Sequence, residues 1–419
     1  MDRYDYLIVG SSHAALEAAH AIRLWDQSGS LALVTRDAHP PYSPTVLPYV
    51  VSGRSLPDRV GLRSADYFAD NDIDLQLDTS VIGVETQEKR IQLAGGMVLG
   101  YEKLLLATGA RAIVPPIAGL SDVPFRVLRT LDDAIALREA REQVRSAVVL
   151  GAGLIGMHAA ENLAKAGVAV TVVERESRVL AGYFDQTASD LIADAFTNNG
   201  VDMRLGHTVT TAGHQSDPDC LVVSLDNGEE MCTDLLLVAT GVTPEINFLA
   251  GSGILTDQGI LVDDTMRTNV ENVWAAGDVA QARNFYDPKR KVINGILPNA
   301  VEQGRIAGMA MAGDPAVKPF PGAVPLNTYT FFGEQAVAVG LDRCDGAEVV
   351  TENDLPNRRY RKFLLRDGRL LGASAINDPL DGGVLWQLIL REVDLTPVRE
   401  QFLAQPLQTG RTLMSQIWR

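Results

Sequence analysis

The most constraining feature of this sequence is a pattern that occurs twice, in which a short apolar run leads into a small-residue turn, a helix-like stretch and a second apolar run. The first copy begins with a β-type run over 6–9 and turns through Gly10–Ala15. A helical stretch then extends to about Trp25, and a second β-type run covers 31–34. This order of apolar periods is typical of a βαβ unit.

The second copy lies about 140 positions later. Its first apolar run covers 147–150, the turn is Gly151–Gly156, the predicted helix ends near Ala166, and the returning strand covers 168–173. Two βαβ units in one chain of 419 residues predict an α/β architecture with more than one domain.

The second turn has the full G-x-G-x-x-G spacing at Gly151, Gly153 and Gly156, with Leu154 and Ile155 opening the helix. The three glycines permit a tight turn, a close approach of the backbone to a pyrophosphate, and close packing of the helix on the strand. Glu174 ends the returning strand 18 residues after Gly156, where a carboxylate accepts hydrogen bonds from ribose hydroxyls and repels a 2′-phosphate. The motif therefore predicts NAD rather than NADP, a preference that the neighbouring Arg175 weakens slightly.

The first turn is degenerate, because it reads Gly10-x-Ser12-His13-Ala14-Ala15. Ser12 adds a side chain where the backbone must approach phosphate, and Ala15 replaces the packing glycine. The ribose position falls on Arg36 or Asp37. Alone, this copy is a weaker indication of dinucleotide binding than the second.

Further motifs accompany the two turns in a fixed order. Leu106–Arg111 and Val238–Pro244 each contain Ala-Thr-Gly after an apolar run, and 272–278 is an apolar strand that ends in Gly277-Asp278. Together these motifs resemble those of the FAD-dependent pyridine-nucleotide oxidoreductases. The resemblance covers essentially residues 1–320.

The resemblance implies two Rossmann-like domains, one for FAD and one for NAD, followed by a C-terminal α+β domain. It places the FAD domain at 1–115 and 240–320, the NAD domain at 116–239, and an α+β interface domain at 321–419. In the resembling family the Gly-Asp aspartate holds the FAD ribityl chain, and a helix like 298–305 directs its N-terminus at the flavin. The expected FAD residues are Gly10, Ser12, His13, Ala14, Ala15, Arg36, Asp37, Thr45, Val81, Ala107, Thr108, Gly109, Arg111, Gly277, Asp278, Asn299 and Ala300. The expected NAD residues are Gly151, Gly153, Leu154, Ile155, Gly156, Glu174, Thr240 and Gly241.

Residues beyond 320 have a different pattern, with alternating β-type segments such as 362–365 and a turn at Asp367-Gly368. This pattern is the basis for the separate α+β domain.

The segment after the first βαβ unit lacks the redox-active cysteine that many family members have there. Thr45 stands at the position of the sulfur in single-cysteine members, as the following Leu47-Pro48-Tyr49 indicates. Disulfide reduction and peroxide reduction through a sulfenic acid are therefore disfavoured. The flavin is expected to exchange electrons with a group outside this chain.

No general acid or base is expected, because the nicotinamide and the flavin supply the hydride chemistry. His158 is the one possible catalytic residue, since the family often has a glutamate at that position, near the nicotinamide. It either tunes the nicotinamide pocket or fills space between domains.

Composition excludes several classes of partner and site. The net charge of −16 repels nucleic acid and anionic membranes, and no apolar run approaches the length of a membrane span. The three cysteines and six histidines form no local metal motif and no local disulfide framework, so no metal is expected. We expect a cytoplasmic protein.

The sequence as a whole, including the tail 409–419, is similar to NADH-linked flavoprotein subunits of 2-oxoacid:acceptor oxidoreductase complexes. That similarity implies partner subunits with iron–sulfur clusters and thiamine diphosphate. Two basic clusters, Arg358–Lys362 and Lys289–Lys291, are either docking surfaces or ordinary solvated surface. A stand-alone NADH-dependent ferredoxin or rubredoxin reductase, an NADH oxidase and a flavin-bearing assembly subunit remain alternatives.

Overall fold

The structure is a computed structural model that describes residues 2–64, 66–216 and 219–417. The chain forms two compact units, and each is assembled from separate segments. Unit 1 comprises 1–46, 55–111 and 242–323, and unit 2 comprises 47–54, 112–241 and 324–419. Of the tail that suggested the resemblance, residues 418 and 419 lie outside the described residues.

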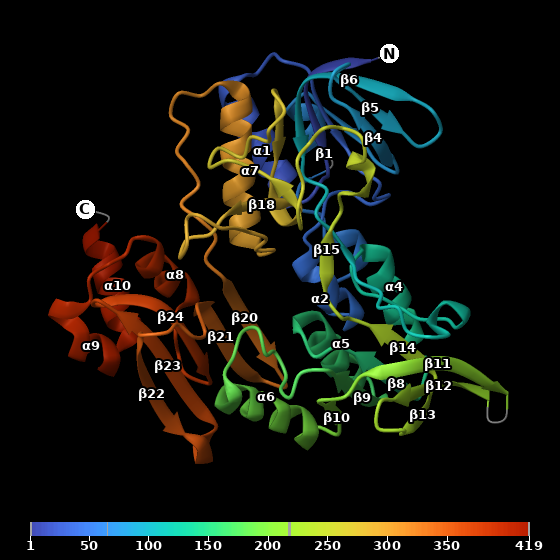
Figure 1. The fold of residues 1–419 in the computed structure, drawn as a ribbon, viewed down its shortest axis with the longest axis vertical. Coiled ribbons are helices and arrows are strands. Elements are labelled where there is room, and N and C mark those ends of the chain that lie inside the picture. Colours follow the sequence, from blue (N-terminus) through green and yellow to red (C-terminus); the bar gives the residue numbers. More distant parts are fainter. Residues whose placement is uncertain (1, 65, 217–218, 418–419) are drawn as a thin grey trace. The chain divides into compact units, whose positions relative to one another are not determined.

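Unit 1 is built on a mixed sheet in the order β3-β2-β1-β6-β5-β4, with β17 also paired to β6. Figure 1 labels β1, β6, β5 and β4 of this sheet. The strands β1, β2, β3, β6 and β17 run parallel, whereas β4 and β5 form an antiparallel extension. Their bounds are β1 Arg3–Val9, β2 Leu31–Val34, β3 Ile73–Gln76, β4 Val81–Glu85, β5 Arg90–Leu93, β6 Val98–Leu106 and β17 Val273–Ala275. Smaller strands are β7 Ala110–Ala112, β15 Val242–Pro244, β16 Ile260–Leu261, β18 Ala280–Arg283 and β19 Lys291–Val292.

Two helices of unit 1, α1 (His13–Trp25) and α7 (Leu297–Ala312), pack against each other through small residues. A Cβ atom at Gly304 would lie 2.2 Å from the carbonyl oxygen of Ala14, and one at Gly308 would lie 2.4 Å from that of Ala18. The two backbones can therefore approach only because glycine faces alanine. A short helix, α3 (Tyr67–Asp70), completes the unit.

Unit 2 contains a parallel sheet in the order β10-β9-β8-β14 and an antiparallel meander β11-β12-β13. Their bounds are β8 Ser146–Leu150, β9 Ala169–Glu174, β10 Asp202–Leu205, β11 Val209–Ser216, β12 Asp219–Leu225, β13 Glu230–Thr233 and β14 Leu235–Val238. The associated helices are α2 Leu47–Val51, α4 Leu131–Ala140, α5 Leu154–Lys165 and α6 Gln186–Asn198.

The C-terminal part of unit 2 is an antiparallel sheet in the order β20-β21-β24-β23-β22 with three helices (Figure 1). The strands are β20 Leu326–Phe331, β21 Glu334–Gly340, β22 Glu348–Asp354, β23 Arg359–Arg366 and β24 Arg369–Ile376. The helices are α8 Gly382–Leu390, α9 Arg399–Ala404 and α10 Pro406–Ile417. Asp367 and Gly368 both have positive φ and join β23 to β24 in the tight turn that the sequence predicts.

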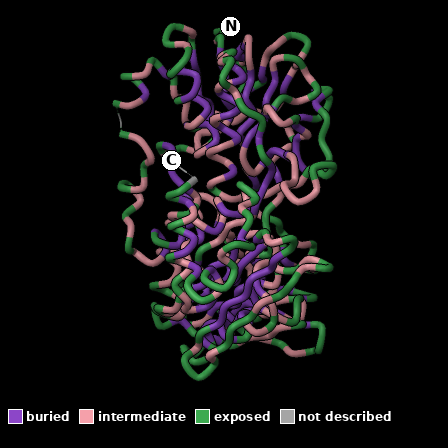
Figure 2. Tube along the Cα trace, turned by 90° about the vertical axis from the view of Figure 1, so that its left-hand side faces the viewer, coloured by how far each residue is buried: buried purple, intermediate pink, exposed green. Residues whose placement is uncertain are grey.

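The sheet strands carry most of the core. β2 and β14 are buried at every position, as expected for parallel strands covered on both faces. Figure 2 shows buried stretches inside the trace and exposed residues mostly at its outer turns. The predicted α/β class, with two Rossmann-like units and a C-terminal α+β part, is confirmed.

One feature of unit 2 corrects the sequence analysis. Cys220 on β12 and Cys232 on β13 form a disulfide with Cα atoms 5.7 Å apart, although no local disulfide framework was expected. The two cysteines are 12 positions apart, and only the pairing of their strands brings them together.

Candidate functional site

The first candidate site lies at the carboxyl ends of the parallel strands of unit 1. Val9 of β1 and Ala275 of β17 both pair with Leu106 of β6, so the turns that follow these three strands emerge at one edge of the sheet. The carboxyl edge of an open parallel sheet is where such folds bind nucleotides.

Close packing joins the residues of these turns. Gly10 has φ +120°, and a Cβ there would lie 2.2 Å from the carbonyl oxygen of Ala107. A Cβ at Gly277 would lie 3.2 Å from that of Ala14 and 3.8 Å from that of Ala300. The structure therefore brings together five of the residues expected to hold FAD, which come from four separate parts of the sequence.

The start of α1 is tied to the segment that follows β2. The Ser12 hydroxyl donates to the carbonyl oxygen of Tyr42 at 3.3 Å, and His13 Nε2 lies 2.8 Å from Ser43 Oγ. Ser43 Oγ lies 2.7 Å from the Thr45 hydroxyl. The first amides of a helix have no partners within the helix, so they are available to an anionic group such as a phosphate.

Sequence reasoning missed Glu245, which organises the expected ribose region. Its carboxylate lies 3.1 Å from Arg36 Nη1 and 4.0 Å from Arg111 Nε. Its backbone carbonyl accepts from the Thr108 hydroxyl at 3.0 Å, and its N–H donates to the carbonyl oxygen of Gly109 at 3.1 Å. Glu245 thus holds two expected FAD arginines beside the first Ala-Thr-Gly turn.

The other expected FAD residues occupy distinct positions. Asp37 accepts from the Tyr42 hydroxyl at 2.7 Å, so its carboxylate is engaged in the turn after β2. Val81 is the first residue of β4 and packs against the core of unit 1. Asn299 is buried near the start of α7, where its side-chain amide donates to the carbonyl oxygen of Asn294 at 3.4 Å.

The Gly-Asp pair lies beside the start of α7. The Gly277 N–H donates to the Gln303 side chain at 2.9 Å, and a Cβ at Gly295 would lie 3.2 Å from the Asp278 carboxylate. No side chain caps the N-terminus of α7, whose first turn contains Pro298. A helix N-terminus stabilises a negative charge that lies close to its first turn.

The second candidate site is the glycine turn between β8 and α5 in unit 2. A Cβ at Gly151 would lie 2.5 Å from the carbonyl oxygen of Ala239, and one at Gly156 would lie 2.0 Å from that of Gly151. A Cβ at Gly153 would meet nothing within 4 Å. Two glycines therefore close the turn, while the third leaves open space of the kind a pyrophosphate needs. Leu154 and Ile155 follow as the first residues of α5.

Glu174 is directed at this turn from the end of β9. Its carboxylate accepts from the Ala152 N–H at 2.7 Å and from the Glu176 N–H at 2.8 Å. A carboxylate has lone pairs for further hydrogen bonds, so it can still accept from ribose hydroxyls. The Arg175 side chain is 78% exposed and pairs only loosely, at 3.4 Å, with Glu176.

The second Ala-Thr-Gly turn closes the other side of the same sheet edge. The Thr240 hydroxyl donates to the carbonyl oxygen of Ile113 at 2.9 Å, and the Ile113 N–H donates to that of Gly241 at 2.9 Å. Thr240 and Gly241 follow β14, which pairs in parallel with β8.

His158 lies on α5 and packs edge-on against Tyr329 of β20, with ring centroids 4.4 Å apart. Burial lowers the pKa of His158 from 6.5 to about 4, with Glu161 opposing the shift and Arg54 adding to it. His158 is therefore neutral near pH 7. The aromatic contact is a structural role for this side chain, and a role at the nicotinamide stays a prediction.

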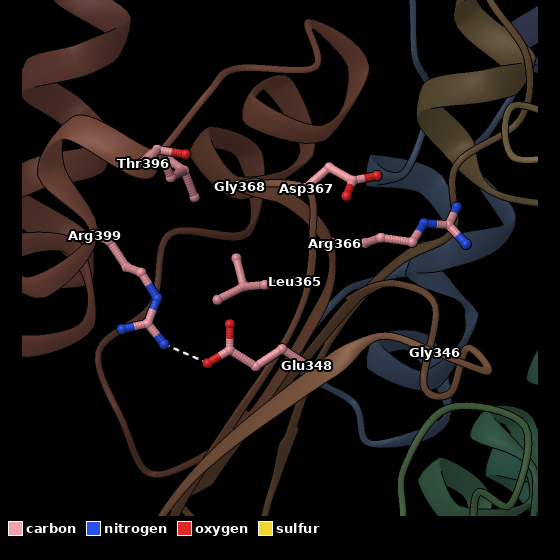
Figure 3. A pocket seen from close by; sticks show the side chains of 9 residues that line it. Gly346, Glu348, Leu365, Arg366, Asp367, Gly368, Thr396 and Arg399 are labelled. Atoms are coloured by element: carbon pink, nitrogen blue, oxygen red, sulfur yellow. Dashed lines mark hydrogen bonds and ion pairs between the residues drawn. The ribbon is translucent and has the colours of Figure 1, made fainter.

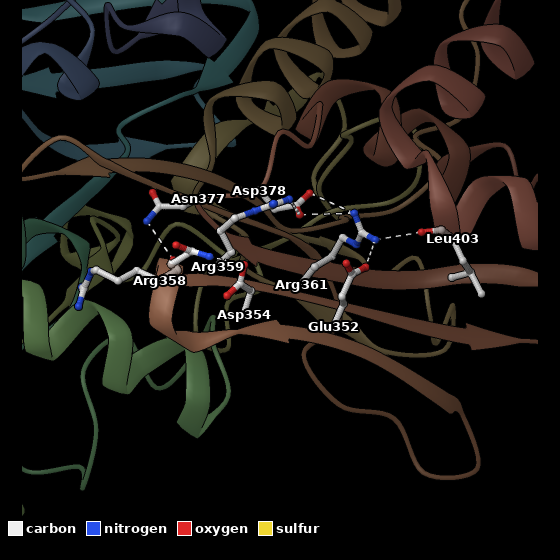
Figure 4. Close-up of polar contacts among 9 residues, drawn as sticks. Glu352, Asp354, Arg358, Arg359, Arg361, Asn377, Asp378 and Leu403 are labelled. Carbon is white, nitrogen blue, oxygen red and sulfur yellow. Dashed lines mark hydrogen bonds and ion pairs between the residues drawn. The ribbon is translucent and has the colours of Figure 1, made fainter.

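The four cations of the cluster Arg358–Lys362 are all paired with acids, and Figure 4 shows Arg359 and Arg361 beside Asp378. Arg358 pairs with Glu334 at 2.5 Å, Arg359 with Asp378 at 3.0 Å, and Arg361 with Glu352 and Asp378. Lys362 pairs with Asp185 at 3.1 Å and Asp342 at 3.0 Å. Arg361 and Lys362 are only 8% exposed, so acids of unit 2 neutralise these cations. Lys289, Arg290 and Lys291, by contrast, are exposed just before and within β19.

A pocket of about 280 Å³ lies between β22, the β23–β24 turn and the start of α9 (Figure 3). Its wall contains Glu348, Arg366, Asp367 and Arg399, and Glu348 pairs with Arg399 across it. None of the residues expected to bind FAD or NAD lines this pocket.

Two kinds of feature are absent from the described residues. No group of three or more His, Cys, Asp or Glu side chains in 2–64, 66–216 and 219–417 is arranged to hold a metal ion. Over the same ranges, no helix has the length and apolar character required to cross a membrane.

In each unit a glycine turn lies at the carboxyl edge of parallel strands, an arrangement typical of proteins that bind two nucleotide cofactors. Residues 4–304 match the family described as "Pyridine nucleotide-disulphide oxidoreductase". The chain belongs to this family and is an NAD(H)-dependent flavoprotein oxidoreductase that uses FAD. The glycine turns, with open space at Gly153, fit these cofactors.

Several known proteins are similar over nearly the whole chain. "NADH-dependent phenylglyoxylate dehydrogenase subunit epsilon" of Aromatoleum evansii is 53% identical over 426 residues, covering 100% of this chain and 99% of the relative. "Rhodocoxin reductase" of Rhodococcus erythropolis is 32% identical, covering 93% and 90%. The crystal structure of "Ferredoxin Reductase for the CYP199A2 System" from Rhodopseudomonas palustris superposes with a TM-score of 0.81 at 28% identity, covering 89% and 91%.

Proposed function

We propose that this chain is the NADH-linked flavoprotein subunit of a 2-oxoacid:acceptor oxidoreductase complex acting on phenylglyoxylate. The observation that carries the proposal is the 53% identity, over the full length of both chains, to a phenylglyoxylate dehydrogenase epsilon subunit. In such a complex, partner subunits with thiamine diphosphate and iron–sulfur clusters oxidise phenylglyoxylate with coenzyme A to benzoyl-CoA. This chain then uses the electrons to reduce NAD⁺.

The residues of each unit support a division of labour. In unit 1, the turns around Gly10, Ala107 and Gly277, with Arg36, Asp278 and the start of α7, would hold FAD. In unit 2, the Gly151–Gly156 turn, Glu174 and the Thr240-Gly241 turn would hold NAD. When bound, the flavin supplies the ability to take electrons singly and release them as a pair.

The chain's own residues bind and orient the cofactors. Glu174 selects a free ribose over a phosphorylated one by charge repulsion. The N-terminus of α7 favours negative charge at the flavin. The absence of a cysteine at Thr45 supports an electron-transfer partner outside the chain, because no thiol of the expected FAD set is available to store electrons.

A second candidate is a stand-alone NADH-dependent reductase for a small iron–sulfur protein. The 32% identity to rhodocoxin reductase and the similarity to a ferredoxin reductase structure favour it. For either function we propose a cytoplasmic location, where NAD(H) is available.

Two measurements test these proposals. Anaerobic titration of the purified chain with NADH should bleach a flavin band near about 450 nm at close to one NADH per flavin, and NADPH should be much less effective. A flavin that stays oxidised would instead support a flavin-bearing assembly subunit. Purification of the tagged chain from the cells that naturally produce it distinguishes the two candidate functions. A stable multi-subunit complex would support the dehydrogenase subunit, and a lone chain would support the stand-alone reductase.

A further inference from the structure

The proposed function creates a requirement for proton transfer. NADH delivers a hydride, which is two electrons and one proton. A partner that takes electrons alone leaves one proton behind for every hydride, and the reverse reaction takes one up. A chain that links NAD(H) to a one-electron partner therefore has to move one proton between the flavin and the solvent in each turnover.

The structure contains a hydrogen-bonded row of three side chains in unit 1 that is suited to this task. His13 Nε2 lies 2.8 Å from Ser43 Oγ, and Ser43 Oγ lies 2.7 Å from Thr45 Oγ1. A hydroxyl can donate and accept at the same time, and an imidazole can take a proton on one nitrogen while it holds one on the other. Ser43 is only 8% exposed, so a water molecule cannot easily take over its role in the row.

One end of this row is Thr45, an expected FAD residue, and its segment is held at the start of α1 by the hydrogen bond from the Ser12 hydroxyl to the carbonyl oxygen of Tyr42. Thr45 occupies the position at which cysteine-bearing members of the family keep their redox sulfur, the group that exchanges electrons with the cofactor. His13 itself opens α1, directly after the first glycine turn.

The other end of the row leads toward solvent. Glu17 lies one turn along α1 from His13 and forms an ion pair with Arg63 at 3.5 Å. The side chains of Glu17 and Arg63 are 28% and 30% exposed, so this pair is in contact with water. Burial lowers the pKa of His13, the charges of Glu17 and Asp278 raise it, and Arg63 lowers it. A histidine in this balance gives up a proton easily after accepting one.

We propose that Thr45, Ser43 and His13 form a proton path between the flavin site and the surface beside Glu17. When a bound flavin gives up two electrons, Thr45 would take up the released proton and pass its own hydroxyl proton to Ser43, and Ser43 would pass its proton to His13 Nε2. His13 then releases a proton to water near Glu17. Reduction of the cofactor by the partner runs the same transfers in reverse, so that protons balance in both directions.

The test compares two half-reactions of the FAD-loaded full chain. Reduction by NADH brings its own proton, whereas anaerobic reoxidation by ferricyanide, a one-electron acceptor, requires proton release. The variants are Ser43→Ala and His13→Gln, which break the row, and Ser43→Thr, which keeps a hydroxyl. The matched control is His20→Gln, an exposed histidine on the same helix.

Stopped-flow absorbance follows each half-reaction, and a pH-indicator dye follows the released proton. We expect Ser43→Ala and His13→Gln to slow reoxidation and proton release about tenfold to a hundredfold more than they slow reduction by NADH. Ser43→Thr and His20→Gln should both keep the rates of reoxidation and proton release near those of the wild type. Reoxidation in D₂O should slow for the wild type, and at least as strongly for the broken variants, because proton release limits their rate.

Equal effects on the two half-reactions, or unchanged proton release, would overturn the proposal. Loss of FAD from both broken variants, seen as loss of the visible spectrum, would assign the row to cofactor binding and would also overturn it. Failure of NADH to reduce the flavin in the wild-type chain would instead contradict the proposed function and is recognised before any variant is compared.

Discussion

The glycines of the second turn differ in the space that a Cβ atom would have, so substitutions at two of them should have different effects. A Cβ at Gly153 would meet nothing within 4 Å, and Gly153 has the extended backbone (φ −77°, ψ 179°) that any residue adopts. Gly153→Ala should therefore fold. A Cβ at Gly156 would lie 2.0 Å from the carbonyl oxygen of Gly151, so Gly156→Ala forces the backbone to shift.

The magnitudes follow from these contacts. In Gly153→Ala, the reduced entropy of the unfolded chain stabilises by about 0.4–1 kcal/mol, and a poorer helix N-cap costs a similar amount. The melting temperature should thus stay within about 2 °C of the wild type. A methyl group in the space expected for the pyrophosphate should weaken NADH binding at least tenfold, or about 1.4 kcal/mol. Gly156→Ala should lose about 1–3 kcal/mol of stability and melt several degrees lower.

The assay is thermal unfolding together with anaerobic NADH titration of the FAD-loaded chain. Gly213→Ala is the control, because a Cβ there also meets nothing and Gly213 lies in the meander of the same unit. If Gly153→Ala bound NADH within twofold of the wild type, the space at Gly153 would not be the site of the pyrophosphate, and the assignment of this turn would be wrong.

Three further predictions concern charge. Glu174→Gln should raise the Kd for NADH about tenfold, because hydrogen bonds to a charged group are stronger. It should also bring the Kd for NADPH closer to the Kd for NADH. An unchanged ratio of the two Kd values would contradict selection by charge. Reversal of charge at Lys289 and Lys291 to Glu should weaken binding of an acidic iron–sulfur partner, measured by titration calorimetry at low and high salt, whereas Lys318→Glu serves as the exposed control. Burial lowers the folded-state pKa of His158 to about 4, so the unfolded state binds more protons than the folded state between pH 6.5 and 4. The free energy of unfolding should therefore fall by up to about 1.4 kcal/mol for each pH unit as the pH decreases through this range. His158→Phe should flatten that part of a urea-unfolding profile between pH 6.5 and 4, and an unchanged slope would show that other groups cause it.

Local patterns were sufficient for the elements around the two turns. The predicted strands at 31–34 and 147–150 agree with β2 and β8, and the predicted helices end within about one residue of α1 and α5. These elements depend on apolar period and glycine position, which lie within one stretch of sequence. The family resemblance placed Gly10, Ala107 and Gly277 at one site. They lie at one edge of the sheet because each follows the carboxyl end of a parallel strand.

Contacts that depend on strand register were not predictable. Arg361 lies opposite Glu352 and Arg359 opposite Asp354 because β22 and β23 pair in that register. A run of cations in the sequence suggested a positive surface, whereas the sheet places acids beside most of them. Glu245 is separated from Arg36 by 209 positions, so no local pattern connects the two.

The degenerate first turn shows why a motif that counts residue types is an incomplete guide to binding. Ser12 places a side chain where the second copy has Gly153, which argued against a close approach of phosphate. In the structure the Ser12 hydroxyl donates to the carbonyl oxygen of Tyr42, so the added atoms are held by the segment after β2. Gly10 meanwhile retains the positive φ and the contact with Ala107 that close the turn. We therefore expect that binding at this turn requires a free path to the helix N-terminus, and that a serine bound to a neighbouring carbonyl can leave that path open.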